Sequence, residues 1–239
     1  MSFDPYEFDR SYPAVDAGLT ESQYTVRTFL WMVLGLMITF GVAVAGWLTN
    51  ATLYVLVSFP AAHLVVLVIT FILAITMTRR IETMTVAAAQ GIFIAYAVLL
   101  GFTMSTWLYL YSMTSVVLVF LATALYFGVL AAYGYFTKRS LARIGTILIS
   151  GLMSLILFGL LSLVFPALAG DYGMFCLIGI AIFLGYTAYD TQRMRDLYYY
   201  YAQQPDMLEK AAIFSALQLY LDFINLFFYL LRFLGKSKN

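Results

Sequence analysis

Two aspartates stand inside segments that the composition assigns to a lipid environment. Asp190 lies near the end of the sixth long apolar segment, and Asp222 lies near the middle of the seventh. A charged side chain at mid-bilayer costs about 3 kcal/mol or more. The 239-residue chain is 63% hydrophobic and only 10% charged. Carboxyl groups at these depths therefore indicate either a functional centre or a tightly paired structural one.

The chemistry available to these two acids depends on how close they lie. Two carboxyl groups within hydrogen-bond distance cannot both ionise cheaply, so the pair shares a proton near physiological pH. With the proton the pair is a neutral clasp, and without it the two charges repel and can open a path that attracts cations. The alternative is that each aspartate pairs with Arg79, Arg80 or Arg193 and only fixes helix packing. A salt bridge that breaks during gating would satisfy both interpretations.

A polar stripe runs along the seventh apolar segment through Asp222. Its members are spaced 3, 4, 3 and 4 residues apart and are Ser215, Gln218, Asp222, Asn225 and Tyr229. This spacing places them on one face of a helix whose other positions are mostly Leu, Phe and Ile. Since hydrocarbon cannot solvate such a stripe, we expect it to face other helices or a water-filled pore.

These residues must be positioned by a bundle of membrane-spanning helices. About 20 helical residues cross the hydrocarbon core, and the chain contains seven apolar segments of that length. They run approximately over Val26–Leu48, Tyr54–Met77, Met84–Trp107, Met113–Phe136, Gly145–Pro166, Gly173–Arg193 and Ala211–Leu234. Pro60 either kinks the second segment or marks where its helix begins. The sequence therefore predicts an all-α, polytopic membrane protein, with a short N-terminal tail (1–25), a transmembrane domain (26–234) and a short basic C-terminal tail (235–239).

The orientation in the membrane follows from the basic residues. Ten lie on the N-terminal side, namely Arg10, Arg27, Arg79, Arg80, Lys138, Arg139, Arg143, Arg193, Arg195 and Lys210. The other side has only Arg232, Lys236 and Lys238, all in or near the tail. The positive-inside rule then predicts a cytoplasmic N-terminus. Seven spans would put the basic tail outside, whereas a re-entrant seventh segment would leave both ends inside.

Charge and cysteine content exclude several other classes. A net charge of +1 gives no basic field for nucleic acid. The single cysteine, Cys176, excludes an intramolecular disulfide and a cysteine metal cluster. The expected surroundings are therefore the lipid bilayer, ions and protons, with a membrane-protein partner as a further option.

Two long motifs around the aspartates resemble the Bax inhibitor-1 (transmembrane BAX inhibitor motif) family, in its bacterial form. They are Thr187-Ala188-Tyr189-Asp190-Thr191-Gln192 and Leu219-Tyr220-Leu221-Asp222-Phe223-Ile224-Asn225-Leu226-Phe227, the second closing at Leu230-Leu231-Arg232. The resemblance extends to Tyr133-Gly134-Tyr135 with Thr137-Lys138-Arg139 and to the segment that opens near Gln23, so it covers nearly the whole chain.

The resemblance implies a seven-helix bundle whose last helix is central. It also implies a pH-sensitive calcium leak in the inner membrane, with Asp190 and Asp222 as the proton sensor and as transient calcium ligands, and with no tightly bound cofactor. An arginine at the cytoplasmic end of the second helix would latch onto the aspartates in a closed state. Arg79 and Arg80 occupy that place, and Arg79 is the first choice because it lies nearer the membrane.

Two other functions remain as alternatives. One is a non-conducting regulator of a membrane protease or of a stress response, which are roles also described for family members. The other is an intramembrane aspartyl protease, which would use the Tyr189-Asp190 pair. That class needs Gly-x-Gly-Asp on the seventh helix, where the glycines admit an extended substrate, but this chain has the bulky Leu219-Tyr220-Leu221-Asp222. We therefore expect a protein without enzymatic activity.

Overall fold

The computed structural model describes residues 19–165 and 172–238, without the side chains of residues 163, 164 and 172. Most of the expected N-terminal tail with Arg10, the end of the fifth expected segment at Pro166, and Asn239 lie outside the described residues. The described chain forms helices α1 (Glu21–Leu48), α2 (Ala51–Ser58), α3 (Ala62–Arg80), α4 (Val86–Leu110), α5 (Met113–Phe136), α6 (Ala142–Val164), α7 (Tyr172–Tyr201) and α8 (Pro205–Leu234). All but α2 are long and apolar enough to cross a membrane, which confirms the all-α polytopic class.

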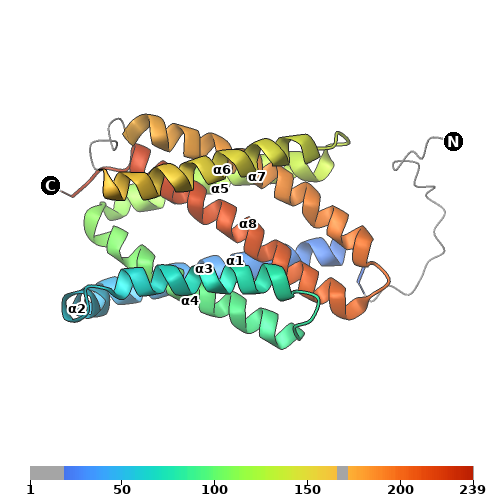
Figure 1. Cartoon of the computed structure of the whole chain (residues 1–239), viewed down its shortest axis with the longest axis horizontal. Coiled ribbons are helices and arrows are strands. Elements are labelled where there is room, and N and C mark those ends of the chain that lie inside the picture. The colour runs from blue at the N-terminus through green and yellow to red at the C-terminus, as the bar shows by residue number, and fades with distance from the viewer. Residues whose placement is uncertain (1–18, 166–171, 239) are drawn as a thin grey trace.

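Helix α8 is the core of the bundle. It runs diagonally between one layer containing α5, α6 and α7 and another containing α1, α3 and α4 (Figure 1). Its most apolar 18-residue window is 78% buried, against 17–39% for the other six candidate spans. The other helices can leave Leu, Ile and Phe exposed because lipid replaces water around them, whereas α8 is surrounded by protein. The last helix is therefore central, as the resemblance implied.

The N-terminal helix begins earlier than hydropathy indicated. Thr20 caps α1: its hydroxyl accepts a hydrogen bond from the Gln23 backbone, and the Gln23 side chain accepts one from the Thr20 backbone. This reciprocal pair satisfies two backbone donors that a helix start otherwise leaves free. As a result, α1 starts at Glu21, inside the expected tail (1–25).

Helix α7 extends further than the expected sixth segment. The sequence predicted a long connection after Arg193, but the helix continues to Tyr201 and only residues 202–204 separate it from α8. The apolar run of the sequence ends near Arg193. The helix continues beyond it because polar side chains at the end of α7 bind residues at the start of α1. The tyrosines at this end pack on α1, with the Tyr24 and Tyr198 rings 5.4 Å apart.

The second expected segment is divided at Pro60. Helix α2 ends at Ser58, and α3 begins at Ala62. Proline has no N–H to donate and disrupts the preceding turn of a helix, so the break falls where the sequence placed it. Helix α3 alone keeps the length of a span.

The C-terminal tail is attached to the bundle. Residues after α8 pair with the α4–α5 turn, where Lys238 N donates to Leu110 O at 2.8 Å and Ser112 N donates to Lys236 O at 3.2 Å. The Lys238 ammonium donates to Leu108 O at 2.8 Å and lies 5.0 Å from the centre of the Trp47 ring. The basic tail therefore has partners within the protein at the end of the bundle opposite the start of α1 (Figure 1).

Candidate di-aspartyl site

Asp190 on α7 and Asp222 on α8 meet inside the bundle. Only 7% of Asp190 and 4% of Asp222 is exposed. The two carboxyl groups lie close enough to interact electrostatically with each other, and Oδ1 of Asp190 and Oδ2 of Asp222 are buried without a hydrogen-bond partner among the described residues. A carboxylate can only accept a hydrogen bond. A direct hydrogen bond between the two groups would therefore require a proton on one of them.

The helical extension of α7 is what allows this contact. The expected sixth segment ends at Arg193, whereas α7 continues through Arg195 to Tyr201. Helices α7 and α8 are consecutive and antiparallel, joined by a short turn at one end of the bundle (Figure 1). Asp190 lies before the last three turns of α7, and Asp222 lies past the middle of α8.

Residues around Asp190 are held by close contacts with α5 and α6. A Cβ added to Gly134 would lie 2.2 Å from the Ala188 carbonyl oxygen, so only glycine lets α5 approach α7 this closely. The side chain of Gln192 binds the α5–α6 turn twice, accepting from Leu141 N at 2.8 Å and donating to Arg139 O at 2.9 Å. These contacts give a structural reason for the Tyr-Gly-Tyr motif on α5 and for the glutamine two residues after Asp190.

Asp222 is held by the packing of its neighbours on α8. The Tyr220 hydroxyl is 2.6 Å from the Thr39 hydroxyl on α1, and Thr39 donates to Ala97 O on α4 at 3.0 Å. On the other side, the Phe223 ring lies 5.3 Å from Phe120 on α5. The backbone next to Asp222 is therefore anchored to α1, α4 and α5, which fixes its rotation toward α7.

The residues of the predicted polar stripe have different partners in the structure. Ser215 lies 3.2 Å from the Tyr24 hydroxyl on α1, and Asn225 donates to Leu221 O of its own helix at 2.8 Å. Tyr229 packs on α7, where its ring covers Gly179 and stacks on Phe183 at 5.8 Å. Gln218 is half-buried. The stripe thus faces α1 and α7, and its role as a pore lining stays a prediction.

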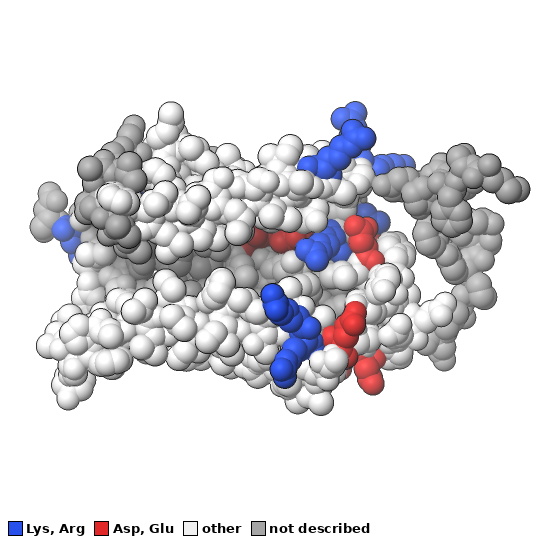
Figure 2. Space-filling view, in the orientation of Figure 1, with Lys and Arg blue, Asp and Glu red and all other residues white. Residues whose placement is uncertain are grey.

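None of the predicted basic partners forms an ion pair with the acids in the described chain. Arg79, Arg80 and Arg193 are exposed, and within residues 19–165 and 172–238 the ion pairs involve neither aspartate. Arg193 nevertheless interacts electrostatically with Asp190, three residues before it on α7. In the orientation of Figure 2, acidic atoms line a hollow between the two helix layers, with basic side chains along its margin. The packing interpretation is therefore met in part for Asp190, whereas the charged group that interacts with Asp222 is Asp190.

Sequence reasoning missed a polar network at the same end of the bundle. Glu21 pairs with Arg195 at 3.0 Å and accepts from the Tyr199 hydroxyl at 2.6 Å. Lys210, which is 7% exposed, donates to Glu82 O at 3.0 Å. These pairs join α1 to α7 and the α3–α4 turn to α8. They link positions more than 100 residues apart, so no local pattern could have revealed them.

The two carboxyl groups alone do not make a closed metal site. Among the described residues, no group of three or more His, Cys, Asp or Glu side chains is placed to hold a metal ion. Hard divalent cations such as calcium take six to eight oxygen ligands. Two carboxyl groups supply too few of these for a closed cage.

Comparison with known proteins decides the family. Residues 21–239 match the family described as "Inhibitor of apoptosis-promoting Bax1". The chain belongs to the Bax inhibitor-1 family. Among relatives, protein RP147 of Rickettsia prowazekii is 33% identical, over 94% of this chain and 93% of its own. Inner membrane protein YbhL of Escherichia coli strain K12 is 31% identical, over 97% of this chain and 99% of its own. Membership of the Bax inhibitor-1 family agrees with seven candidate spans and with a multi-pass membrane protein.

Proposed function

We propose that this protein is a pH-sensitive calcium leak channel of the inner membrane, gated by the proton that Asp190 and Asp222 share. The observation that carries the proposal is the meeting of two buried carboxyl groups on consecutive helices, with no other described donor on their facing oxygens. A pair that fixed packing alone would be expected to join an acid to a base. An acid–acid contact holds only while the proton is present.

The gate works by a change of charge between α7 and α8. Below the pH at which the pair loses its proton, the clasp is neutral and holds the helices together. Above that pH two negative charges face each other in a medium of low dielectric, and the resulting repulsion favours separation of α7 and α8. The exposed carboxylates then attract a hard cation. With only two acidic ligands the cation leaves readily, which suits a leak.

The latch and the orientation are part of the same proposal. Arg79 and Arg80 end α3 at the end of the bundle where α7 and α8 join (Figure 1). In a second closed state, one of them pairs with the aspartates when α3 moves toward α8. We assign this end to the cytoplasm because most of the basic residues lie there. The relative YbhL is an inner membrane protein, which supports the location.

Calcium flux tests the proposal directly. The full chain is reconstituted into dye-loaded liposomes, and the rate of calcium entry is measured across a pH series for wild type, Asp190→Asn and Asp222→Asn. Wild type should leak faster as pH rises, and both variants should lose this dependence. Asp196→Asn is the matched control, because this aspartate is exposed on the same helix and its variant should behave as wild type.

Two outcomes would remove the proposal. Equal leak by all four chains at every pH would exclude the proton switch. No leak above empty liposomes would favour the non-conducting regulator, which needs no path through the bundle. An intramembrane protease is disfavoured by the structure, since Leu219 and Tyr220 are fully buried beside Asp222 and leave no room for an extended substrate.

A further inference from the structure

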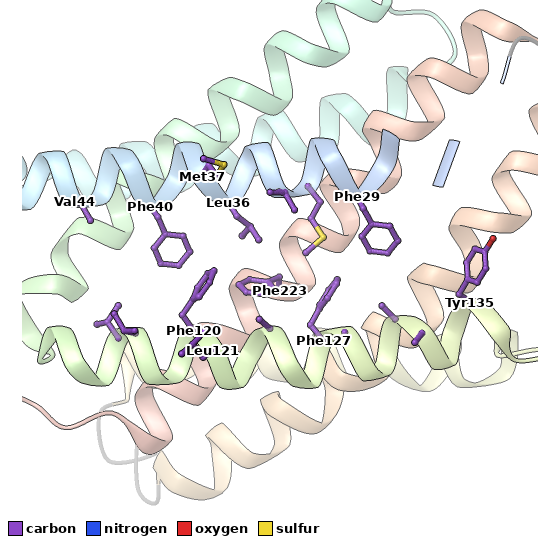
Figure 3. Close-up of a pocket in the computed structure, with 18 of the residues that line it drawn as sticks. Phe29, Leu36, Met37, Phe40, Val44, Phe120, Leu121, Phe127, Tyr135 and Phe223 are labelled. Carbon is purple, nitrogen blue, oxygen red and sulfur yellow. The ribbon is translucent and has the colours of Figure 1, made fainter. Parts of the chain in front are cut away.

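An apolar groove opens between α1 and α5, away from the aspartates. Its volume is about 880 Å³, and its lining extends along α1 from Thr25 to Val44 and along α5 from Met113 to Phe136. Phe223 of α8 also lines it. Figure 3 shows the side chains of both helices directed into this space. The groove therefore follows nearly the whole length of two membrane-spanning helices.

The two walls of the groove touch, since the Phe40 and Phe120 rings are 4.7 Å apart and edge to face. A flexible hydrocarbon chain fits around this contact, whereas a helix cannot pass between the walls.

One end of the groove carries polar and basic groups. The Thr25 hydroxyl is buried there without a hydrogen-bond partner in the described chain. Lys138 and Arg139 follow the end of α5, are exposed, and form no ion pair with any described residue. Glu21 at the start of α1 is already paired with Arg195. This end thus offers two exposed positive charges without an ion pair among the described residues, next to an apolar groove.

We propose that the α1–α5 groove binds one membrane phospholipid with an anionic headgroup. Its acyl chains lie along the aromatic walls, and its phosphate faces Lys138 and Arg139 at the level of the Tyr135 ring. Basic residues at the membrane surface attract an anionic headgroup. The proposal is independent of calcium conduction.

Gly128 provides a clean way to fill the groove. It lies in the α5 wall, and a Cβ added there would meet no atom within 4 Å. Gly128→Leu therefore occupies the space of the acyl chains without disturbing the helix. Gly91 on α4 is also exposed with nothing within 4 Å and does not line the groove, so Gly91→Leu is the matched control. Ala124→Leu, in the same wall, is a second groove-filling variant.

Photolabelling tests the site. The chain is reconstituted in phosphatidylcholine vesicles with a phosphatidylglycerol probe that carries a diazirine near the end of one acyl chain, and labelled residues are mapped by mass spectrometry. Lining residues of α1 and α5 should be labelled well above Ile147 on the outer face of α6, which is 71% exposed and reports bulk lipid. Gly128→Leu should reduce this labelling to the Ile147 level, whereas Gly91→Leu should leave it unchanged.

Three results would overturn the proposal. Labelling of the groove no stronger than at Ile147, or unchanged in both Gly128→Leu and Ala124→Leu, would show that no lipid is held there. Equal labelling by a phosphatidylcholine probe, with no effect of Lys138→Gln and Arg139→Gln together, would exclude the anionic headgroup.

Ala124, Gly128 and Ala132 also have the spacing of helix–helix contacts. Cross-linking between copies through Leu121→Cys in a Cys176→Ala chain would make the groove a subunit interface.

Discussion

At the scale of single residues, the partner of each buried acid is another acid. A buried charge is usually balanced by an opposite charge, and here the base that interacts with Asp190, Arg193, is exposed and forms no ion pair with it. Under the proposed function, Asp190 and Asp222 depend on one shared proton for their compatibility. Periodicity placed Asp222 on a polar face, and the family resemblance implied that Asp190 and Asp222 act together. Periodicity alone could not show that they meet, because the contact depends on the full length of α7.

Truncation of one acid should destabilise the fold more than its conversion to an amide. Asp222→Ala leaves Asp190 buried without a donor, which costs about 1–3 kcal/mol. Asp222→Asn keeps a donor for Asp190 and should cost less. Thermal unfolding in detergent at acidic pH, where wild type holds its shared proton, measures both. Equal unfolding temperatures for wild type and Asp222→Ala would contradict the hydrogen-bonded clasp.

The proposal also predicts how the stability of wild type and of Asp222→Asn changes with pH. The unfolding temperature of wild type should fall as pH rises, because loss of the shared proton leaves two charges facing each other. Asp222→Asn should show a flatter profile since only one ionisable group remains. A wild-type profile that rises or stays level through neutral pH would show that no proton is held between the two acids.

At the scale of helices, the sequence predicted the spans well and their polar ends poorly. The break at Pro60 follows from the chemistry of proline, and the seven apolar runs follow from length and composition. The start of α1 and the last two turns of α7 lie beyond the apolar pattern, because capping and interhelical pairs stabilise them. The α1–α5 groove could not be predicted from the sequence either, because it depends on the distance between α1 and α5 where both pack against α8.

The contact between α5 and α7 makes a prediction about glycines on one helix. Gly134→Ala would place a Cβ 2.2 Å from a backbone oxygen, so α7 must shift, at a cost of about 1–3 kcal/mol. Gly128→Ala, six residues earlier on the same helix, meets open space and should be neutral or stabilising by up to about 1 kcal/mol. Unfolding temperatures of the two variants in detergent compare them. Equal values would show that the α5–α7 approach is not tight.

At the scale of the whole molecule, the seven candidate spans favour an odd number of membrane crossings. Helix α8 is continuous over 30 residues, and it carries the C-terminus to the end of the bundle opposite the start of α1 (Figure 1). This favours seven full spans over the re-entrant alternative. Two of the three cations that disagreed with the positive-inside rule have partners within the protein: Lys238 binds a carbonyl group and lies over an aromatic ring, and Arg232 lies over another ring. Arg232 lies 5.3 Å from the Trp107 ring centre.

Cysteine accessibility tests this topology. In a Cys176→Ala chain, Ser58→Cys and Lys236→Cys should react with a membrane-impermeant maleimide on intact spheroplasts. Ser140→Cys, exposed in the α5–α6 turn, should react only after the membrane is opened. Protection of Lys236→Cys together with Ser140→Cys would place both chain ends on one side and contradict seven spans.

The shared proton can be observed directly by infrared difference spectroscopy. On raising the pH of the reconstituted protein, the carbonyl stretch of a buried protonated carboxyl group should disappear over the same pH range in which calcium leak increases. The band should shift or vanish in both Asp190→Asn and Asp222→Asn, and remain in Asp196→Asn. A wild-type protein without such a band, or a band that titrates unchanged in both variants, would show that Asp190 and Asp222 do not share a proton.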